Sequence, residues 1–150
     1  MDKPRKKVFI CSPFRPISKD PKMWEAEKED NLRRARQGCR MVSDLGGIPI
    51  APHLYFPQFL DDGTEEERTI GIEMGLALLE KCDELWLFGN RITEGMAREI
   101  GRAAKLKIPI TIVHSLELSE EDVSELLDGI HEMRSSGIRR PYHSSITDRK

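Results

Sequence analysis

The chain has 150 residues, of which 33% are charged and 38% hydrophobic, and its formal net charge at pH 7 is −2. This length and composition predict one soluble globular domain whose core needs no disulfide or metal to fold. The near balance of 24 basic and 26 acidic residues argues against a nucleic acid polymer or an anionic membrane as the main partner.

The three cysteines, Cys11, Cys39 and Cys82, lie in apolar stretches and form no C-x-x-C pattern. They are interpreted as buried thiols of a reducing compartment. No apolar run approaches the roughly 20 residues of a membrane span, and the start lacks a signal-peptide apolar region. The sequence therefore predicts a cytoplasmic protein.

The first half of the chain predicts two strands with a helix between them. Residues 8–11 form a short apolar run that stops at Ser12-Pro13, as a buried strand does. Asp20-Pro21 is a helix-start pattern, and the helix is expected to end at Gly46-Gly47. Residues 48–51 predict a second strand, and residues 52–57 a loop that carries aromatic rings.

A second helix is predicted from the capping-box pattern Thr64-x-x-Glu67. Further apolar residues widen the stripe that we expect to be buried, so we expect other parts of the protein to cover this helix on more than one side. The stripe comprises Ile70, Met74, Ala77 and Leu78, with Ile72, Leu76 and Leu79 beside it.

The second half continues the alternation. Residues 85–88 predict a buried strand, Thr93 is an N-cap for the next helix, and residues 108–113 predict a further strand. A last helix is expected from Ser119 to about Arg134. The domain is thus placed at residues 1–134, with a polar tail at 135–150 that is either loose or ordered at a subunit interface.

This alternation predicts an α/β, doubly wound (flavodoxin/Rossmann-like) parallel sheet with helices on both faces. Right-handed crossovers favour the strand order 2-1-3-4. Ligands of such sheets bind at the carboxyl ends of the strands where the winding reverses, here the first and third.

The helix start at Thr93 is the centre of the predicted site. Unpaired amides at the helix N-terminus can receive an anion or sugar hydroxyls, and Gly95 allows close approach. Glu99 lies one turn further on the same face, and we expect the helix N-terminus to keep it ionised. An ordinary solvated helical Glu is the alternative interpretation. The predicted crevice gathers Ser12, Arg15, His53, Tyr55, Thr93, the Gly95 and Met96 amides, and Glu99.

This set of residues suits a nucleoside or nucleotide, with a carboxylate placed to attack the anomeric carbon as the N-glycosidic bond breaks. His53 is alternatively a plain loop residue, and Arg15 either meets a phosphate or lies on the surface. The four histidines show no metal-ligand spacing, so we expect no metal and no cofactor.

Three segments resemble the nucleoside 2-deoxyribosyltransferase-like superfamily: VFICSPF, the strand LWLFG led by Asp83, and the T-x-G-x-x-x-E pattern from Thr93 to Glu99 followed by IGRA. The segment GGIPIAPHLYFPQFLDD is similar to the DUF4406/DUF7768-like branch of that superfamily. The resemblance covers roughly residues 7 to 115.

The resemblance implies that Glu99 is the nucleophile and that Thr93 and Gly95 hold the sugar or its 5′ end. It also implies that the loop at residues 12–15, Phe14 included, lines the pocket, and that the protein is a homodimer or larger homo-oligomer. Three positions depart from the family pattern. Phe9 replaces a tyrosine that orients the nucleophile, Ile92 replaces an acid, and Gly75 replaces an aspartate, with Glu73 two residues away.

Two hypotheses follow. The first is an N-glycosidase or deoxyribosyltransferase acting on a small-molecule nucleoside or nucleotide through Glu99. The second is a protein that binds a nucleotide or nucleotide-derived signal without cleaving it, which the missing tyrosine and acids favour. An NAD-cleaving activity is a third option.

Overall fold

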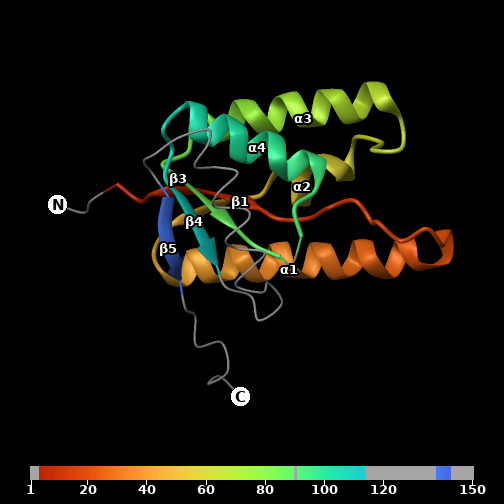
Figure 1. The fold of residues 1–150 in the computed structure, drawn as a ribbon, viewed down its shortest axis with the longest axis horizontal. Helices are drawn as coiled ribbons and strands as arrows, with labels where there is room; N and C mark the ends of the chain where they lie inside the picture. The colour runs from red at the N-terminus through yellow and green to blue at the C-terminus, as the bar shows by residue number, and fades with distance from the viewer. Residues whose placement is uncertain (1–3, 90, 114–137, 143–150) are drawn as a thin grey trace, which may run out of the picture.

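The computed structural model describes residues 4–89, 91–113 and 138–142. Its centre is one parallel sheet with the strand order β2-β1-β3-β4-β5 (Figure 1). The predicted α/β class and the order 2-1-3-4 of the first four strands are confirmed. The strands are β1 (Lys7–Cys11), β2 (Ile48–Ile50), β3 (Glu84–Leu87), β4 (Ile110–Val113) and β5 (Ile138–Tyr142).

The fifth strand lies inside the segment predicted as a polar tail. β5 pairs with β4 in parallel at the edge of the sheet. Its sequence IRRPY has two arginines and a proline, which are tolerated in an edge strand but give no alternating apolar pattern. The rest of that tail and the predicted helix from Ser119 to about Arg134 lie outside the described residues.

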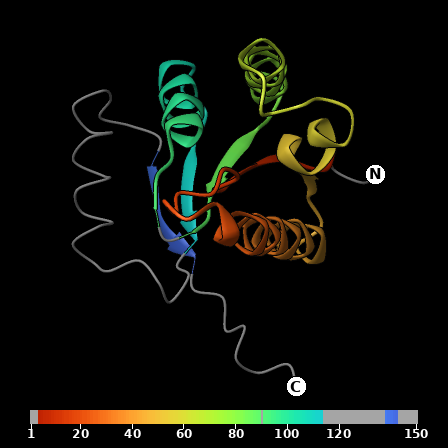
Figure 2. The ribbon, with the colours of Figure 1, turned by 90° about the vertical axis from the view of Figure 1, so that its right-hand side faces the viewer.

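Helices cover both faces of the sheet (Figure 2). Helices α3 (Glu65–Leu79) and α4 (Glu94–Lys105) lie on one face, and α1 (Trp24–Asp44), preceded by the 3-10 helix η1 (Pro21–Met23), lies on the other. Successive residues of β1 follow this division, because side chains of a strand alternate between faces. Phe9 and Cys11 join the core under α3 and α4, whereas Val8 and Ile10 join the core over α1.

Several predicted helix boundaries are confirmed. The Thr64 hydroxyl accepts from the Glu67 amide at 3.3 Å, and Gly46 takes a φ of +85° where α1 has ended. The prediction of a loop at residues 52–57 is wrong. It contains the short helix α2 (Pro52–Tyr55) and the 3-10 helix η2 (Phe56–Gln58), because a proline at the first helical position starts a turn as readily as it breaks one.

The predicted buried stripe of α3 is also wrong in part. Ile70, Ala77 and Leu78 are exposed, and the buried residues are Gly75 and Leu79. Apolar residues lie on both sides of this helix, so periodicity alone does not decide which side packs against the sheet.

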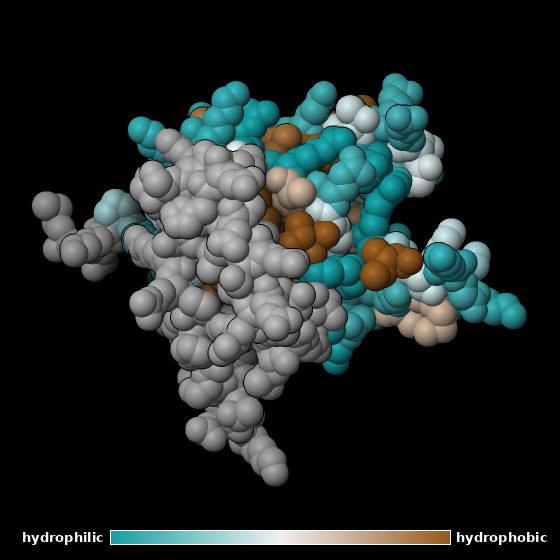
Figure 3. All heavy atoms as spheres, in the orientation of Figure 1, coloured by the Kyte–Doolittle hydropathy of each residue, from teal (hydrophilic) through white to brown (hydrophobic). Residues whose placement is uncertain are grey.

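The surface in Figure 3 carries its hydrophobic side chains in small separate groups among hydrophilic ones, outside the grey atoms. In the described part of the chain, the helices lack the combination of length and apolarity that a membrane crossing requires.

Candidate functional site

The loops that leave β1 and β3 meet closely at the carboxyl edge of the sheet. The Phe88 amide donates to the Cys11 carbonyl at 2.8 Å. Gly89 follows with a φ of +107°, and a Cβ there would lie 2.7 Å from Cδ of Pro13. Only glycine fits both this backbone conformation and this contact. The point at which the winding reverses is therefore tightly packed at its base.

A cavity of about 470 Å³ opens beside this point, between the β1–α1 loop, α2, η2, α3 and the start of α4. One part of its wall is apolar and comes mainly from α2, η2 and α3. The other part is polar and lies near the start of α4. The apolar wall comprises Pro52, Phe56, Pro57, Leu60, Ile72 and Leu76.

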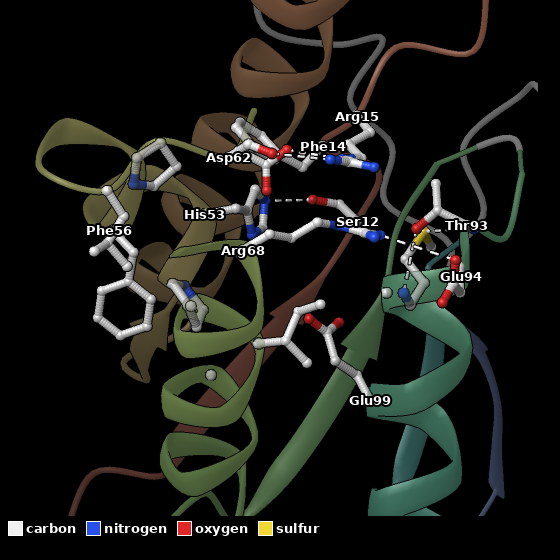
Figure 4. Close-up of a pocket in the computed structure, with 18 of the residues that line it drawn as sticks. Ser12, Phe14, Arg15, His53, Phe56, Asp62, Arg68, Thr93, Glu94 and Glu99 are labelled. Carbon is white, nitrogen blue, oxygen red and sulfur yellow. Dashed lines mark hydrogen bonds and ion pairs between the residues drawn. The ribbon is translucent and has the colours of Figure 1, made fainter. Parts of the chain in front are cut away.

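Glu99 comes from α4, and its carboxylate points into the space between α4 and α3 (Figure 4). The side chain is partly buried, and burial raises its pKa from 4.5 to about 8. A hydrogen bond with the Cys11 thiol lowers the pKa of Glu99 but does not offset burial. The prediction that the helix N-terminus keeps Glu99 ionised is wrong, because the dipole effect fades beyond the first turn and desolvation dominates.

Ser12, Phe14 and His53 lie together on the cavity wall opposite α4. The Ser12 hydroxyl and Nε2 of His53 are 2.8 Å apart, and the rings of Phe14 and His53 are tilted at a centroid distance of 6.3 Å. Burial lowers the pKa of His53 to about 4, so the ring is neutral at pH 7. A neutral imidazole offers a ligand one donor and one acceptor, and here one of its nitrogens already bonds to Ser12.

Arg15 lines the cavity but is already paired. Its Nε donates to Oδ2 of Asp62 at 2.8 Å, and its Nη2 donates to the Asp62 carbonyl at 2.9 Å. Arg91 in turn donates from Nη2 to the Arg15 carbonyl at 2.9 Å. The Nε of Arg91 is buried and has no hydrogen-bond partner among the residues that the structure describes.

Arg68 reaches from α3 towards the start of α4 (Figure 4), where it lies 3.9 Å from a carboxylate oxygen of Glu94. Glu94 has a shorter contact of 2.8 Å with Arg98 on its own helix. Arg68, Asp62 and Arg91 also line the cavity and were not predicted from the sequence. Arg68 follows three glutamates in a helix start, a pattern typical of a solvated face, and only the packing of α3 against α4 brings it to the cavity.

The predicted residues at the start of α4 also line the cavity. The Thr93 hydroxyl accepts from the Met96 amide at 3.2 Å, so these two groups satisfy one another, and the Met96 side chain is buried in the core. Around Gly95, the atom nearest to an added Cβ would be the Thr93 hydroxyl oxygen at 3.9 Å. The predicted open space above this turn is present.

Tyr55 is the one predicted site residue that the cavity lining does not include. Its side chain is 62% exposed. Its ring packs against the rings of Phe56 and Phe59, with centroid distances of 5.7 and 5.2 Å. The turn of α2 directs His53 to the cavity and Tyr55 away from it, because residues two apart in a helix face different directions.

The three departures from the family pattern occupy different surroundings. Phe9 is fully buried in the core under α3 and α4, whereas Ile92 and Gly75 line the cavity. Glu73 is exposed and lies outside the cavity lining. In residues 4–89 and 91–113, no cluster of three or more His, Cys, Asp or Glu side chains is arranged to hold a metal ion.

The fold and the cavity define a class: a doubly wound α/β protein with a partly buried carboxyl group beside the carboxyl ends of β1 and β3. Within that class, the chain belongs to the family described as domain of unknown function DUF7768, which matches residues 6–113. The DUF4406 part of the sequence resemblance stays a prediction. No protein of curated function matches the chain.

Two solved structures share the fold. A 2-deoxyribosyltransferase from the psychrotolerant bacterium Bacillus psychrosaccharolyticus aligns with a TM-score of 0.62 and 16% identity, over 92% of this chain and 86% of that one. The CMP N-glycosidase BcmB of Clostridium botulinum aligns with a TM-score of 0.54 and 18% identity, over 93% of this chain and 90% of that one. At these identities the likeness establishes the fold.

Proposed function

We propose that this protein cleaves the N-glycosidic bond of a nucleoside or nucleotide, with Glu99 as the nucleophile. The observation that carries the proposal is the Glu99 carboxylate, which points into a cavity of about 470 Å³ at the point of the fold where ligands of such sheets bind. The proposal is supported by the shared fold, because both structural neighbours are named for reactions at N-glycosidic or deoxyribosyl groups.

The reaction begins when ionised Glu99 attacks the anomeric carbon of the sugar. The bond from that carbon to the base nitrogen breaks, its electron pair stays on the base, and the base takes a proton from water. Water then attacks the same carbon, the ester bond to Glu99 breaks, and the water proton returns to solution. A second base in place of water would make the reaction a transfer.

The division of the cavity wall suggests how the substrate lies. The apolar wall from α2, η2 and α3 suits the flat face of a base, and the open turn at Gly95 suits the sugar. Arg68 suits a 5′-phosphate, because its contact with Glu94 is long, at 3.9 Å, and a phosphate is a stronger partner for a guanidinium. Arg15 suits that role less well, since Asp62 already pairs with it.

The test is chromatography of nucleosides, 5′-monophosphates, cyclic nucleotides and NAD after incubation with the protein. We expect base release with the wild type and none with Glu99→Ala, whose circular dichroism should match that of the wild type. Glu73→Ala is the matched control, since Glu73 is exposed on α3 and outside the cavity. Unchanged turnover in Glu99→Ala would rule out this mechanism.

A second candidate function is nucleotide binding without cleavage. Gly75 and Ile92 put no acid into the cavity, and the raised pKa of Glu99 leaves it mostly uncharged at pH 7. A rise in melting temperature with one ligand of the same panel, together with intact ligand after long incubation, would support this function over the first. The homo-oligomer implied by the family resemblance stays a prediction, and sedimentation at micromolar concentration tests it.

A further inference from the structure

Cys11 lies directly beneath the proposed nucleophile. It is the last residue of β1, is fully buried, and belongs to the core under α3 and α4. Its Sγ donates to the Met96 carbonyl oxygen over a long 3.9 Å, and the Glu99 carboxyl group is also close enough to be one of the causes that raise the pKa of Cys11. Met96 and Glu99 are three residues apart on α4, so the thiol sits against one face of the first two turns of that helix.

We propose that Cys11 is a positioning residue for Glu99: when Glu99 ionises, the single S–H turns from the Met96 carbonyl to the carboxylate, the stronger acceptor, and holds the charged oxygens towards the cavity. This inference rests on the proposed role of Glu99 for its functional meaning. Among the residues that the structure describes, Cys11 is the one side chain whose hydrogen bond contributes to the pKa shift of Glu99. Phe9, on the same face of β1, has no polar atom with which to do so.

The protonation state of the thiol agrees with its role as the donor. Burial and the neighbouring Glu99 charge raise the pKa of Cys11 well above 9.0, so the thiol keeps its proton at neutral pH. A donor of this kind favours the ionised form of Glu99 and opposes the effect of burial. The strand therefore helps to keep available the form of Glu99 that attacks.

Other charged or titratable side chains share the cavity with Glu99, but the pKa shift of Glu99 has burial and Cys11 as its causes. These side chains are His53 on α2, Glu67 and Arg68 on α3, Glu94 on α4, and Arg15, Asp62 and Arg91 on the loops.

The experiment is a direct titration of Glu99 in the free protein. The side-chain carboxyl carbon of Glu99, assigned with Glu99→Gln, is followed by carbon-13 NMR against pH in the wild type, Cys11→Ala, Cys11→Val and Cys11→Ser. The net effect of a hydrogen bond corresponds to about half to one pKa unit. We expect Cys11→Ala and Cys11→Val, which have no hydrogen-bond donor at this position, to raise the titration midpoint of Glu99 by that amount. Cys11→Ser should keep the midpoint at or below the wild-type value.

Cys82→Ala is the matched control, because Cys82 is a buried thiol that donates to the Leu78 carbonyl at 3.3 Å and is not among the causes of the Glu99 pKa shift. It should lower stability without moving the Glu99 midpoint. Val fills the space of the thiol, so it serves if Ala does not fold. The proposal is overturned if Cys11→Ala or Cys11→Val leaves the Glu99 midpoint unchanged, or if Cys82→Ala moves that midpoint as far as the Cys11 variants do.

The titration needs no substrate, so its result is independent of the proposed function. If the wild type releases no base from any nucleotide while Cys11→Ala still raises the Glu99 midpoint, the proposed function fails and the thiol–carboxylate coupling stands. If base release depends on Glu99 but the midpoint does not respond to Cys11, the reverse holds.

Discussion

Replacing Glu99 with Gln removes a carboxyl group that burial makes harder to ionise in the folded protein than in the unfolded chain. The pKa of Glu99 is about 8 in the fold, compared with 4.5 for an ordinary Glu. Between these two values the folded state binds more protons than the unfolded state, so the free energy of unfolding falls as pH rises through this window. Below the window Glu99 is neutral in both states, and Gln is a close neutral substitute.

The size of this effect follows from the pKa difference, which corresponds to at most about 5 kcal/mol. Glu99 is only partly buried and faces a cavity that admits water, so we expect about half of that, ~2–3 kcal/mol. Relative to the wild type, Glu99→Gln should therefore become more stable by this amount as pH rises from 4.5 to 8.5.

Urea unfolding of both proteins at pH 4.5, 6.5 and 8.5 measures this difference, and the other titrating groups cancel in the comparison. Glu73→Gln controls for the loss of one carboxylate at an exposed position of α3. A wild type and a Glu99→Gln variant whose stabilities run parallel across this range would refute the burial argument. The same result would remove the reason to expect a mostly uncharged Glu99 at pH 7.

Three further predictions concern the frame of the cavity. Gly89→Ala should lower the free energy of unfolding in urea by about 2–3 kcal/mol or more, because its Cβ would meet Pro13 at 2.7 Å. Gly46→Ala, which has a positive φ but nothing within 4 Å of its Cβ, should lower it by only about 1–2 kcal/mol. Equal losses in the two variants would contradict a clash between Cβ and Pro13. The pKa of His53 is about 4 in the fold and 6.5 for the free side chain, so the unfolded state binds more protons between these values and stability falls as pH drops through them. Between pH 7 and pH 4.5, the free energy of unfolding of His53→Gln should therefore fall by roughly 1–3 kcal/mol less than that of the wild type. An equal fall in both proteins would count against this prediction. Thr93→Ala removes the N-cap of α4 and should lower stability by about 1 kcal/mol, seen as a lower melting temperature.

The fold was predictable because its signals are local. The apolar runs of β1 and β3 are buried on both faces, as the strands of a parallel sheet must be, and therefore stand out without any knowledge of their partners. The hydroxyls of Thr64 and Thr93 bond amides three residues away, so their caps depend only on neighbouring sequence. β5 was not predictable in this way, because an edge strand needs no apolar pattern of its own.

The site was predictable only where its residues follow a strand or open a helix. Ser12, Thr93 and Gly95 take their places from the ends of β1 and β3, which the strand order brings together. Arg68 and Tyr55 depend instead on how α3 and α2 are rotated about their axes. α3 has apolar residues on both sides, and α2 is a single turn, so neither helix has a sequence period that settles its rotation.

The sequence by itself determined the order of the first four strands and of α1, α3 and α4, the caps that start α3 and α4, and the presence of a carboxyl group one turn into α4. Only the tertiary structure decided the charge of that group. Ionisation depends on how much water surrounds Glu99, and that depends on α3, α2 and the Cys11 thiol, which come from distant parts of the chain. Strand order follows from local patterns, whereas desolvation is a property of the packed molecule.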